Sequence, residues 1–409
     1  MAFNTALSGL HAASADLQTT GNNIANVNTI GFKKSRAEFA DVYATSFFGS
    51  GTTTIGSGVR VTEIAQMFTQ GNLEYTENVL DIAISGRGFF SLSDSPDTEP
   101  TAFTRNGAFQ LDKDGYIVTD QGQYLFGWRK DFSQGALQVE TNKGDPKAST
   151  DVNMNLNLDA AGTAPAVATF DPADPATYNK ATSVTVYDSL GNPHSLTSYF
   201  VAKNPTTPNQ WDVYQYLDGQ PLDPAKNPVT LEFNTNGVLV SVDGNAGATK
   251  VSYAPHPITG ADDLTITYDY AESTQFNTQF SVNALTQNGY PAGDFTGLEI
   301  SDAGVLFARF SNGNAERLGQ VALARFQNEQ GLIKLGDTQW AESSVSGEKL
   351  LGAPGESNLG TVQSGALEAS TVDLSEQLVR LIVAQQSYQA NAESISTEDT
   401  IIQTLLNIR

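Results

Sequence analysis

The sequence predicts a mixed, mainly β protein in which β-rich domains are nested between two terminal α-helices. Three observations favour this fold class. Apolar residues recur every seven residues at both ends of the 409-residue chain, which is typical of helices that pack against other helices. The long middle instead contains short apolar runs separated by Gly, Pro, Asn and Asp, as in strands joined by turns. Glycine-rich segments separate the two ends from this middle.

Residues 1–30 predict the first helix. The large apolar side chains of Phe3, Leu10, Leu17 and Ile24 lie seven residues apart, and Leu7 follows Phe3 by four residues. Residues 1–27 contain one ionised side chain, Asp16, and so few charges suit close packing against neighbours. Gly21 and the asparagines that follow it lower helix propensity, so we expect the helix to end there.

Residues 366–409 contain no Gly or Pro and predict a long second helix. Asp373 is a good N-cap, and Glu376 completes the pattern of a capping box. A helix from there to the end of the sequence would be about 50 Å long, too long to be buried against one small domain. Its seven-residue repeat is formed by Leu374, Leu381, Tyr388, Ile395 and Ile402, and Leu378, Ala392 and Leu406 flank it.

Two such stripes predict that the terminal helices pair as a coiled-coil-like stalk and also contact copies of themselves. We therefore expect a discontinuous assembly domain, residues 1–30 plus 366–409, that becomes ordered only when neighbouring copies cover it. The repeat residues, with Leu7, Leu378 and Leu406, form the predicted helical seam.

Residues 31–75 plus 346–365 are expected to connect the helices to the middle. FGSGTTTIGSG at 48–58 and SGEKLLGAPGESNLGTVQSG at 346–365 are glycine-rich, as flexible linkers are. Two ordinary loops would explain the composition, but their symmetric placement favours hinges. The candidate hinge residues are Gly49, Gly51, Gly56 and Gly58.

The middle predicts two β domains. Residues 76–146 plus 287–345 form the expected inner domain, where Asn106-Gly107, Asp114-Gly115 and other turn signals separate short strands. Residues 147–286 form the expected outer domain, in which strand-like segments such as SVTVYD and QWDVYQYL alternate with proline-rich interruptions.

Composition excludes several classes of protein. The formal charge of −23, from 22 Lys+Arg and 45 Asp+Glu, repels nucleic acid and anionic lipid. The chain has no cysteine, so neither disulfides nor thiolate chemistry is expected. No apolar run is long enough to span a bilayer, and the N-terminal residues lack the pattern of a secretory signal peptide.

The motifs of common enzymes are also missing. The three histidines, His11, His194 and His256, are isolated in the sequence, and no zinc, phosphate-loop or dinucleotide motif is present. LDKDGY at 111–116 resembles part of a calcium loop but lacks the remaining ligands, so a hairpin turn is the better interpretation. The sequence does not exclude a catalytic pair of Asp or Glu carboxylates that lie far apart in the chain. We expect no enzyme activity, no cofactor and no metal.

Several long segments resemble the bacterial flagellar rod and hook proteins. They are LSGLHAASADLQTTGNNIANVNTIGFKKSRAEFADV at 7–42, LDIAISGRGFFSL at 80–92, FTRNGAFQLDKDGYIVT at 103–119, and residues 365–409 along their whole length. TVYDSLGNPHSLTSYFVAKN at 185–204 and the segment at 286–332 are similar to the outer domain and return segment of the hook members of the family.

The resemblance implies a subunit that polymerises into a curved, flexible hollow tube outside the cell. Such a tube joins the flagellar rod to the filament, transmits torque and passes exported subunits. The implied partners are copies of the chain, the distal rod protein, the hook cap protein, the hook–filament junction protein and the flagellar type III export apparatus. Two alternatives remain: a rod protein of the same family, and a secreted β-rich adhesin or glycan-active protein.

Overall fold

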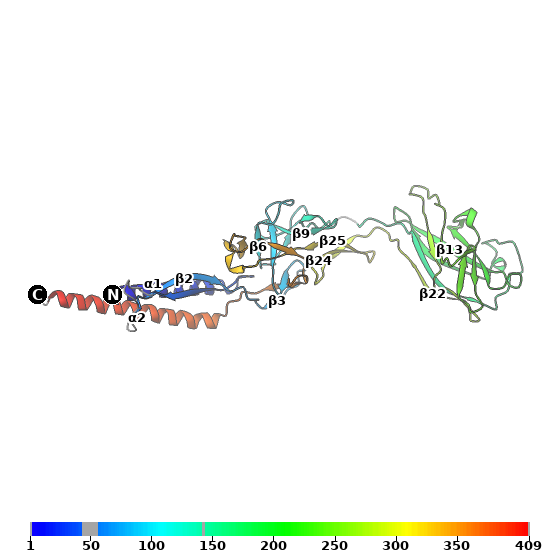
Figure 1. Ribbon diagram of the computed structural model, residues 1–409. Helices are drawn as coiled ribbons and strands as arrows, with labels where there is room; N and C mark the ends of the chain where they lie inside the picture. Colours follow the sequence, from blue (N-terminus) through cyan, green and yellow to red (C-terminus); the bar gives the residue numbers. More distant parts are fainter. Residues whose placement is uncertain (1, 43–55, 141–143, 408–409) are drawn as a thin grey trace. The chain divides into compact units, whose positions relative to one another are not determined.

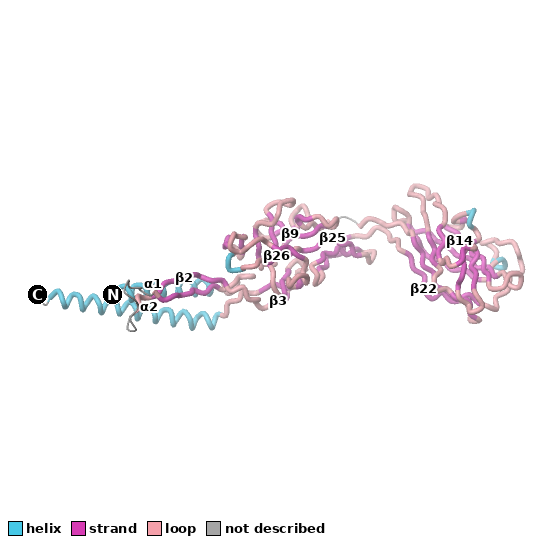
Figure 2. Tube along the Cα trace, in the orientation of Figure 1, coloured by secondary structure: helices cyan, strands magenta, loops and turns pink. Residues whose placement is uncertain are grey.

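The computed structural model describes residues 2–42, 56–140 and 144–407, and the chain forms two compact units (Figure 1). Unit 1 comprises residues 1–141, 297–309 and 315–409, and unit 2 comprises residues 142–296 and 310–314. The expected fold class is confirmed, because helices occur at both ends and strands dominate the middle (Figure 2). Unit 2 extends beyond the 147–286 range expected for the outer domain.

The two long helices belong to unit 1 and are α1 (Ala2–Ala25) and α2 (Leu374–Asn407). Gly21 does not end α1, contrary to expectation, since the helix continues to Ala25. Just beyond the helix end, the side-chain amide of Asn26 donates to the carbonyl of Asn22 at 2.8 Å, which satisfies a backbone acceptor that the helix end leaves free. None of the described helices is long and apolar enough to cross a membrane.

A β-hairpin follows α1 and packs against it. Its strands β1 (Ser35–Asp41) and β2 (Val59–Gln66) pair antiparallel with an irregularity after Glu38, and both contact α1. This part of the chain, expected to be a connector, therefore contains regular structure with defined pairing.

The main sheet of unit 1 is built from short strands (cyan to orange in Figure 1). Its continuous path runs through β23 (Phe295–Ile300), β24 (Val305–Phe310), β25 (Ala315–Val321), β9 (Tyr124–Arg129), β5 (Phe89–Ser93), β6 (Ala102–Thr104), β28 (Gln339–Ala341) and β27 (Ile333–Gly336). The strands that branch from this path are β7 (Gln110–Leu111), β8 (Ile117–Val118), β10 (Gln134–Ala136), β26 (Leu323–Arg325) and β29 (Leu350–Gly352).

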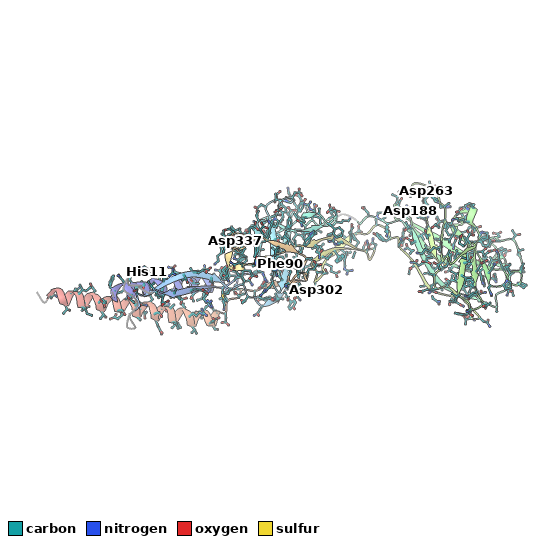
Figure 3. All side chains as sticks on the ribbon, in the orientation of Figure 1. His11, Phe90, Asp188, Asp263, Asp302 and Asp337 are labelled. Carbon is teal, nitrogen blue, oxygen red and sulfur yellow. The ribbon has the colours of Figure 1, made fainter. Side chains whose placement is uncertain are left out.

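Aromatic side chains fill the core of this sheet. Phe89, Phe103, Phe326 and Trp340 are all buried and meet edge to face, a favourable arrangement of aromatic rings. Phe90, labelled in Figure 3, makes a similar contact with Phe109.

The turn between β7 and β8 includes the segment LDKDGY. The carboxylate of Asp112 accepts hydrogen bonds from the backbone amides of Asp114 and Tyr116 at 2.6 and 3.2 Å. This segment is therefore a hairpin turn stabilised by its own aspartate, as expected.

Two further strand pairs join early and late parts of unit 1. β3 (Leu73–Tyr75) pairs with β31 (Ala366–Glu368), and β4 (Ile82–Ser85) pairs with β30 (Thr361–Ser364). The second range expected to be a connector, 346–365, thus contributes β29 and β30 to paired strands.

A buried cluster of three charges lies beside these pairs. Glu368 has no exposed side-chain surface, and its carboxylate contacts Lys33 Nζ at 2.5 Å and Arg105 Nη1 at 3.1 Å. The same carboxylate accepts from the backbone amide of Gly71 at 2.7 Å, and Lys33 also donates to the carbonyl of Thr69. Burial lowers the pKa of Lys33, although Glu368 opposes this shift. One carboxylate therefore holds together the segment after α1, the main sheet and the segment before α2.

Unit 2 consists of two sheets around one core (green to yellow in Figure 1). The first contains β12 (Lys180–Tyr187), β13 (Pro193–Ala202), β14 (Gln210–Leu217), β15 (Gln220–Pro221), β16 (Val229–Phe233), β17 (Leu239–Val242) and β18 (Asn245–Ala246). The second contains β11 (Asp151–Asp159), β19 (Lys250–Ser252), β20 (Thr267–Asp269), β21 (Thr274–Phe276) and β22 (Ser281–Gln287). Side chains from both sheets, including Leu156, Phe200 and Trp211, are buried together.

His194 lies between two aspartates at one end of the first sheet of unit 2. Its Nδ1 is 2.6 Å from Asp218 and its Nε2 is 3.4 Å from Asp188, which Figure 3 labels. Burial works to lower the pKa of His194, but the hydrogen bonds to the two carboxylates outweigh it, so the pKa is raised. The ring of His194 thus connects the β12–β13 turn to the turn after β14.

Replacing Glu368 by Gln should destabilise unit 1 by about 3–5 kcal/mol, because two buried cations then lose their counter-charge. Native-state hydrogen exchange of the β3 and β31 amides measures this loss. Glu74→Gln is the control, since Glu74 is exposed on β3. A loss below about 1 kcal/mol would show that the cluster contributes no more than a surface ion pair.

The contribution of His194 to stability should depend on pH. Because its folded pKa is raised, the contribution is fully present below about pH 6.5 and is lost as the pH rises through the folded value. We expect hydrogen-exchange protection at Asn192 and Ser195, corrected for intrinsic rates, to fall over that range. His194→Gln should remove this trend, and the same trend in the variant would assign it to another group.

Candidate self-assembly surface

The terminal helices pair antiparallel along their lengths. Asn23 donates from its side-chain amide to Gln377 Oε1 at 3.0 Å. Gly9 lies against Asn391, since a Cβ placed on Gly9 would be 2.4 Å from Asn391 Oδ1. Gly9 and Asn23 are fourteen residues apart on α1, as Gln377 and Asn391 are on α2. This matching separation fixes one constant register between the helices.

The buried side chains of the two helices are small or polar. They pack against the other helix or the β1–β2 hairpin, and they are Ala6, Ala12, Ala13, Thr19, Thr20 and Asn23 on α1, and Gln377 and Ala384 on α2. The absence of a side chain at Gly9 lets the helix backbones approach closely, as small residues do in other helix pairs. The intrachain interface therefore depends on close backbone contact more than on large apolar groups.

The predicted seam residues flank this interface or face outward. Leu7, Leu10, Leu17, Ile24, Leu381 and Ile395 are half-buried, whereas Phe3, Leu374, Leu378, Tyr388 and Ile402 are exposed. The side chain of Leu406 lies outside the described residues. The sequence contained a signal for the true centre, because Gly9, Asp16 and Asn23 recur every seven residues, as do Gln377, Ala384 and Asn391. The predicted seam consists of large apolar side chains and does not include these residues.

Asp16 lies on the same face of α1 as Gly9 and Asn23. Burial raises the pKa of Asp16, and the positive charge of Arg380 on α2 works against that rise. The carboxylate is thus partly desolvated between the helices, and α2 supplies the nearby opposite charge.

α2 exposes many large apolar side chains. In the first ten residues of the helix, Val379 is 62% exposed and Leu378 is 45% exposed. The exposed apolar side chains of α2 are Leu374, Leu378, Val379, Ile382, Val383, Tyr388, Ile401 and Ile402. These side chains lie on several sides of the helix and do not form one stripe. Exposed apolar surface of this extent marks an interaction site, and we call these eight residues the α2 apolar surface.

The β1–β2 hairpin packs against α1 as α2 does. Asn23 joins three elements, because its side chain also exchanges hydrogen bonds with the backbone of Ser35 on β1 at 2.8 and 2.9 Å. At the other end of the hairpin, the amide of Val59 donates to Ser8 Oγ at 3.2 Å.

The predicted hinge glycines fall partly in this hairpin. Gly58 has a φ of +108°, and a Cβ there would lie 2.2 Å from Ser8 Oγ, so Gly58 permits close contact with α1. A Cβ placed on Gly56 would meet no other atom within 4 Å. Gly49 and Gly51 lie outside the described residues. A hinge role for these glycines stays a prediction.

The start of α2 is capped and linked to the segment after α1. Asp373 Oδ1 accepts from the amide of Glu376 at 3.0 Å. The Glu376 carboxylate contacts Lys34 at 3.1 Å and Arg380 at 3.0 Å. The hydrogen bond and charge of Lys34 lower the pKa of Glu376. Glu376 therefore contributes an ion pair between the two ends of the chain.

Nothing among the described residues forms a metal-binding group of His, Cys, Asp and Glu side chains. His11 is exposed on α1, as Figure 3 shows, and His256 accepts or donates a hydrogen bond with the carbonyl of Leu222 in unit 2. The prominent chemical feature of the terminal helices is therefore the α2 apolar surface.

Four family models match successive parts of the chain. "Flagella basal body rod protein" matches residues 3–33, and "Flagellar basal body rod FlgEFG protein C-terminal" matches residues 363–408. Between them, "Flagellar hook protein FlgE/F/G D1 domain" matches residues 83–163 and "Flagellar basal body protein FlaE D2 domain" matches residues 155–290. The first two models contain α1 and α2.

Full-length relatives extend this agreement. The flagellar hook protein FlgE of Escherichia coli (strain K12) is 41% identical, with all of both chains covered. That of Borreliella burgdorferi is 34% identical, with 98% of both chains covered. The crystal structure of Helicobacter pylori flagellar hook protein FlgE2 has a similar fold, with a TM-score of 0.55, 17% identity, and coverage of 72% of this chain and 100% of that chain. The chain described here belongs to the flagellar hook protein FlgE family.

Proposed function

We propose that this chain is the structural subunit of a bacterial flagellar hook and polymerises with its own copies into a curved hollow tube. The observation that carries the proposal is the 41% identity, over the whole of both chains, to the flagellar hook protein of Escherichia coli. The tube transmits torque from rod to filament and passes exported subunits. The subunit acts outside the cell as a structural protein and not as an enzyme.

The α2 apolar surface is the structural observation that supports assembly. A monomer leaves these side chains in water, and burial against a neighbouring copy would be favourable at about 25 cal/mol for each Å² of apolar surface. The helix pair leaves this surface uncovered, whereas α1 packs against both α2 and the hairpin and exposes fewer large apolar side chains. Neighbouring copies are therefore the natural partners of α2.

Charge supports a position for the helix pair on the inside of the tube. Residues 381–407 contain no Lys or Arg, and residues 2–32 contain one acidic side chain, Asp16. A wall with few charges gives an unfolded chain few sites to bind as it passes. The strand-rich parts carry most of the acidic side chains and suit the outer surface.

The further partners in this proposal are those of a hook. They are the distal rod protein at one end, the cap protein during growth, the hook–filament junction protein at the other end, and the type III export apparatus. A rod protein of the same family is the second candidate. The D2-domain match at residues 155–290 and relatives named as hook proteins in several bacteria favour the hook.

Replacing Leu381 or Ile395 by Asp should abolish tube formation, since both side chains are half-buried beside the helix pair and a charge there is costly to bury. The sheets should stay folded, as circular dichroism of the monomer would show. Leu378→Asp is the matched variant, because Leu378 is exposed in the monomer. It should leave the helix pair intact and still raise the critical concentration for assembly. Normal tubes from all three variants would contradict the role of these helices.

Deleting the gene should leave cells with a rod but no hook, and the intact chain should restore the hook. Electron microscopy of isolated basal bodies distinguishes this result from the loss of the rod itself, which the rod-protein alternative predicts. Purified chain brought to polymerising conditions should form curved tubes, and straight rods would favour the alternative.

A further inference from the structure

Arg87 is held at the surface of unit 1 by a rigid loop. Gly86 and Gly88 on either side have φ values of +116° and +124°, which L side chains rarely adopt. The amide of Gly360 donates to the carbonyl of Arg87 at 2.7 Å, and Arg105 Nη2 donates to the carbonyl of Gly86 at 2.9 Å. The loop is thus fixed to the turn before β30 and to the buried charge cluster, while the Arg87 side chain remains exposed.

Arg87 shares a groove of about 470 Å³ with a second arginine, Arg325, at the end of β26. The other residues that line it are Phe326, Gln327, Asn328, Glu329 and Gln330. Glu329 to Gly331 form the short helix η3. The groove therefore combines two guanidinium groups with amide side chains and one carboxylate.

Neither arginine has an ion-pair partner among the described residues, although acidic residues outnumber basic ones two to one, 45 against 22. Three other cations of unit 1 do have one, since Arg36, Arg129 and Lys349 contact Glu38, Asp97 and Glu99. Exposed Arg60 on β2 has no ion pair among the described residues, but it does not line this groove. Glu329 lies in the same groove and yet forms no ion pair with Arg87 or Arg325. Two arginines without ion-pair partners line one groove, and the backbone that carries Arg87 is held in place, so the groove can bind carboxylates.

We propose that Arg87 and Arg325 bind carboxylates on the acidic surface of a second copy of this chain. The inference rests on the proposed function, because a polymer brings copies into contact. Charge complementarity favours this occupant: each copy carries a net charge of −23, so an arginine groove on one copy relieves repulsion against the next. The groove and the acidic surface differ, so the contact is heterologous and can repeat along a tube.

Chemical cross-linking tests the contact directly. In the Arg87→Lys and Arg325→Lys variants, a carbodiimide joins the lysine amine to a touching carboxylate as an amide, and the water lost converts the carbodiimide to a urea. Tubes grown from a mixture of ¹⁴N and ¹⁵N chains should give mixed-isotope peptides that link position 87 or 325 to an acidic residue. The Arg87→Gln variant is the control and should give no link at that position. Tubes that form normally but yield only links within one chain, for example to Glu329, would overturn the proposal.

Charge reversal provides a second measurement. The Arg87→Glu, Arg325→Glu double variant should raise the critical concentration for assembly at least about tenfold. The Lys147→Glu, Lys180→Glu double variant changes two exposed residues of unit 2 and gives the control with the same net charge. A small fraction of the arginine double variant should also shorten wild-type tubes, because each added copy has an acidic surface but no functional groove. Assembly equal to that of the lysine double variant would overturn the proposal. Failure of wild-type chain to form tubes would instead refute the proposed function.

Discussion

The fold of unit 1 depends on a single buried carboxylate. Glu368 neutralises Lys33 and Arg105, which come from segments far apart in the sequence, and has no exposed surface of its own. A buried ion pair adds little net stability over apolar packing, but losing one partner is costly. The cluster therefore acts mainly on specificity, since it admits one arrangement of the segments after α1, within the main sheet and before α2. The capped start of α2 and the register of the helix pair both follow from that arrangement.

Within the helix pair, small and polar side chains are buried, while several large apolar side chains are exposed. Gly9 lies against Asn391 and Ala384 is buried, whereas Leu378 and Val379 remain exposed. The contact between the two ends of one chain therefore does not use these large apolar side chains. Asn23 adds a polar contact to both α2 and β1, and such a buried amide favours one register over others.

The sequence was sufficient for the fold class, the terminal helices and the family. Seven-residue apolar repeats and turn residues are local signals, so they could be recognised without knowing the neighbours. The contacts at the centre of the helix pair could not be recognised in the same way, because Gly9 matters through its lack of a side chain and Asn391 through its position against Gly9. Glu368 was equally inaccessible, since one acidic residue among 45 is distinguished only by the two cations that the fold brings to it. The pairing of 346–365 with distant strands likewise depends on tertiary structure.

Chain connectivity sets the order in which the two units can form. β3 pairs with β31 and β4 pairs with β30, so Leu73 and Ile82 can pair only after Glu368 and Ser364 have been added to the chain. Unit 2 is almost continuous in sequence and has its own core, so it can fold first. Pairings between distant residues form slowly, because the entropy cost of closing a long loop comes before the contacts that stabilise it. A chain that emerges N-terminus first would consequently leave these two strand pairs open until nearly its last residues have arrived, and a chain truncated before residue 361 could not form either pair.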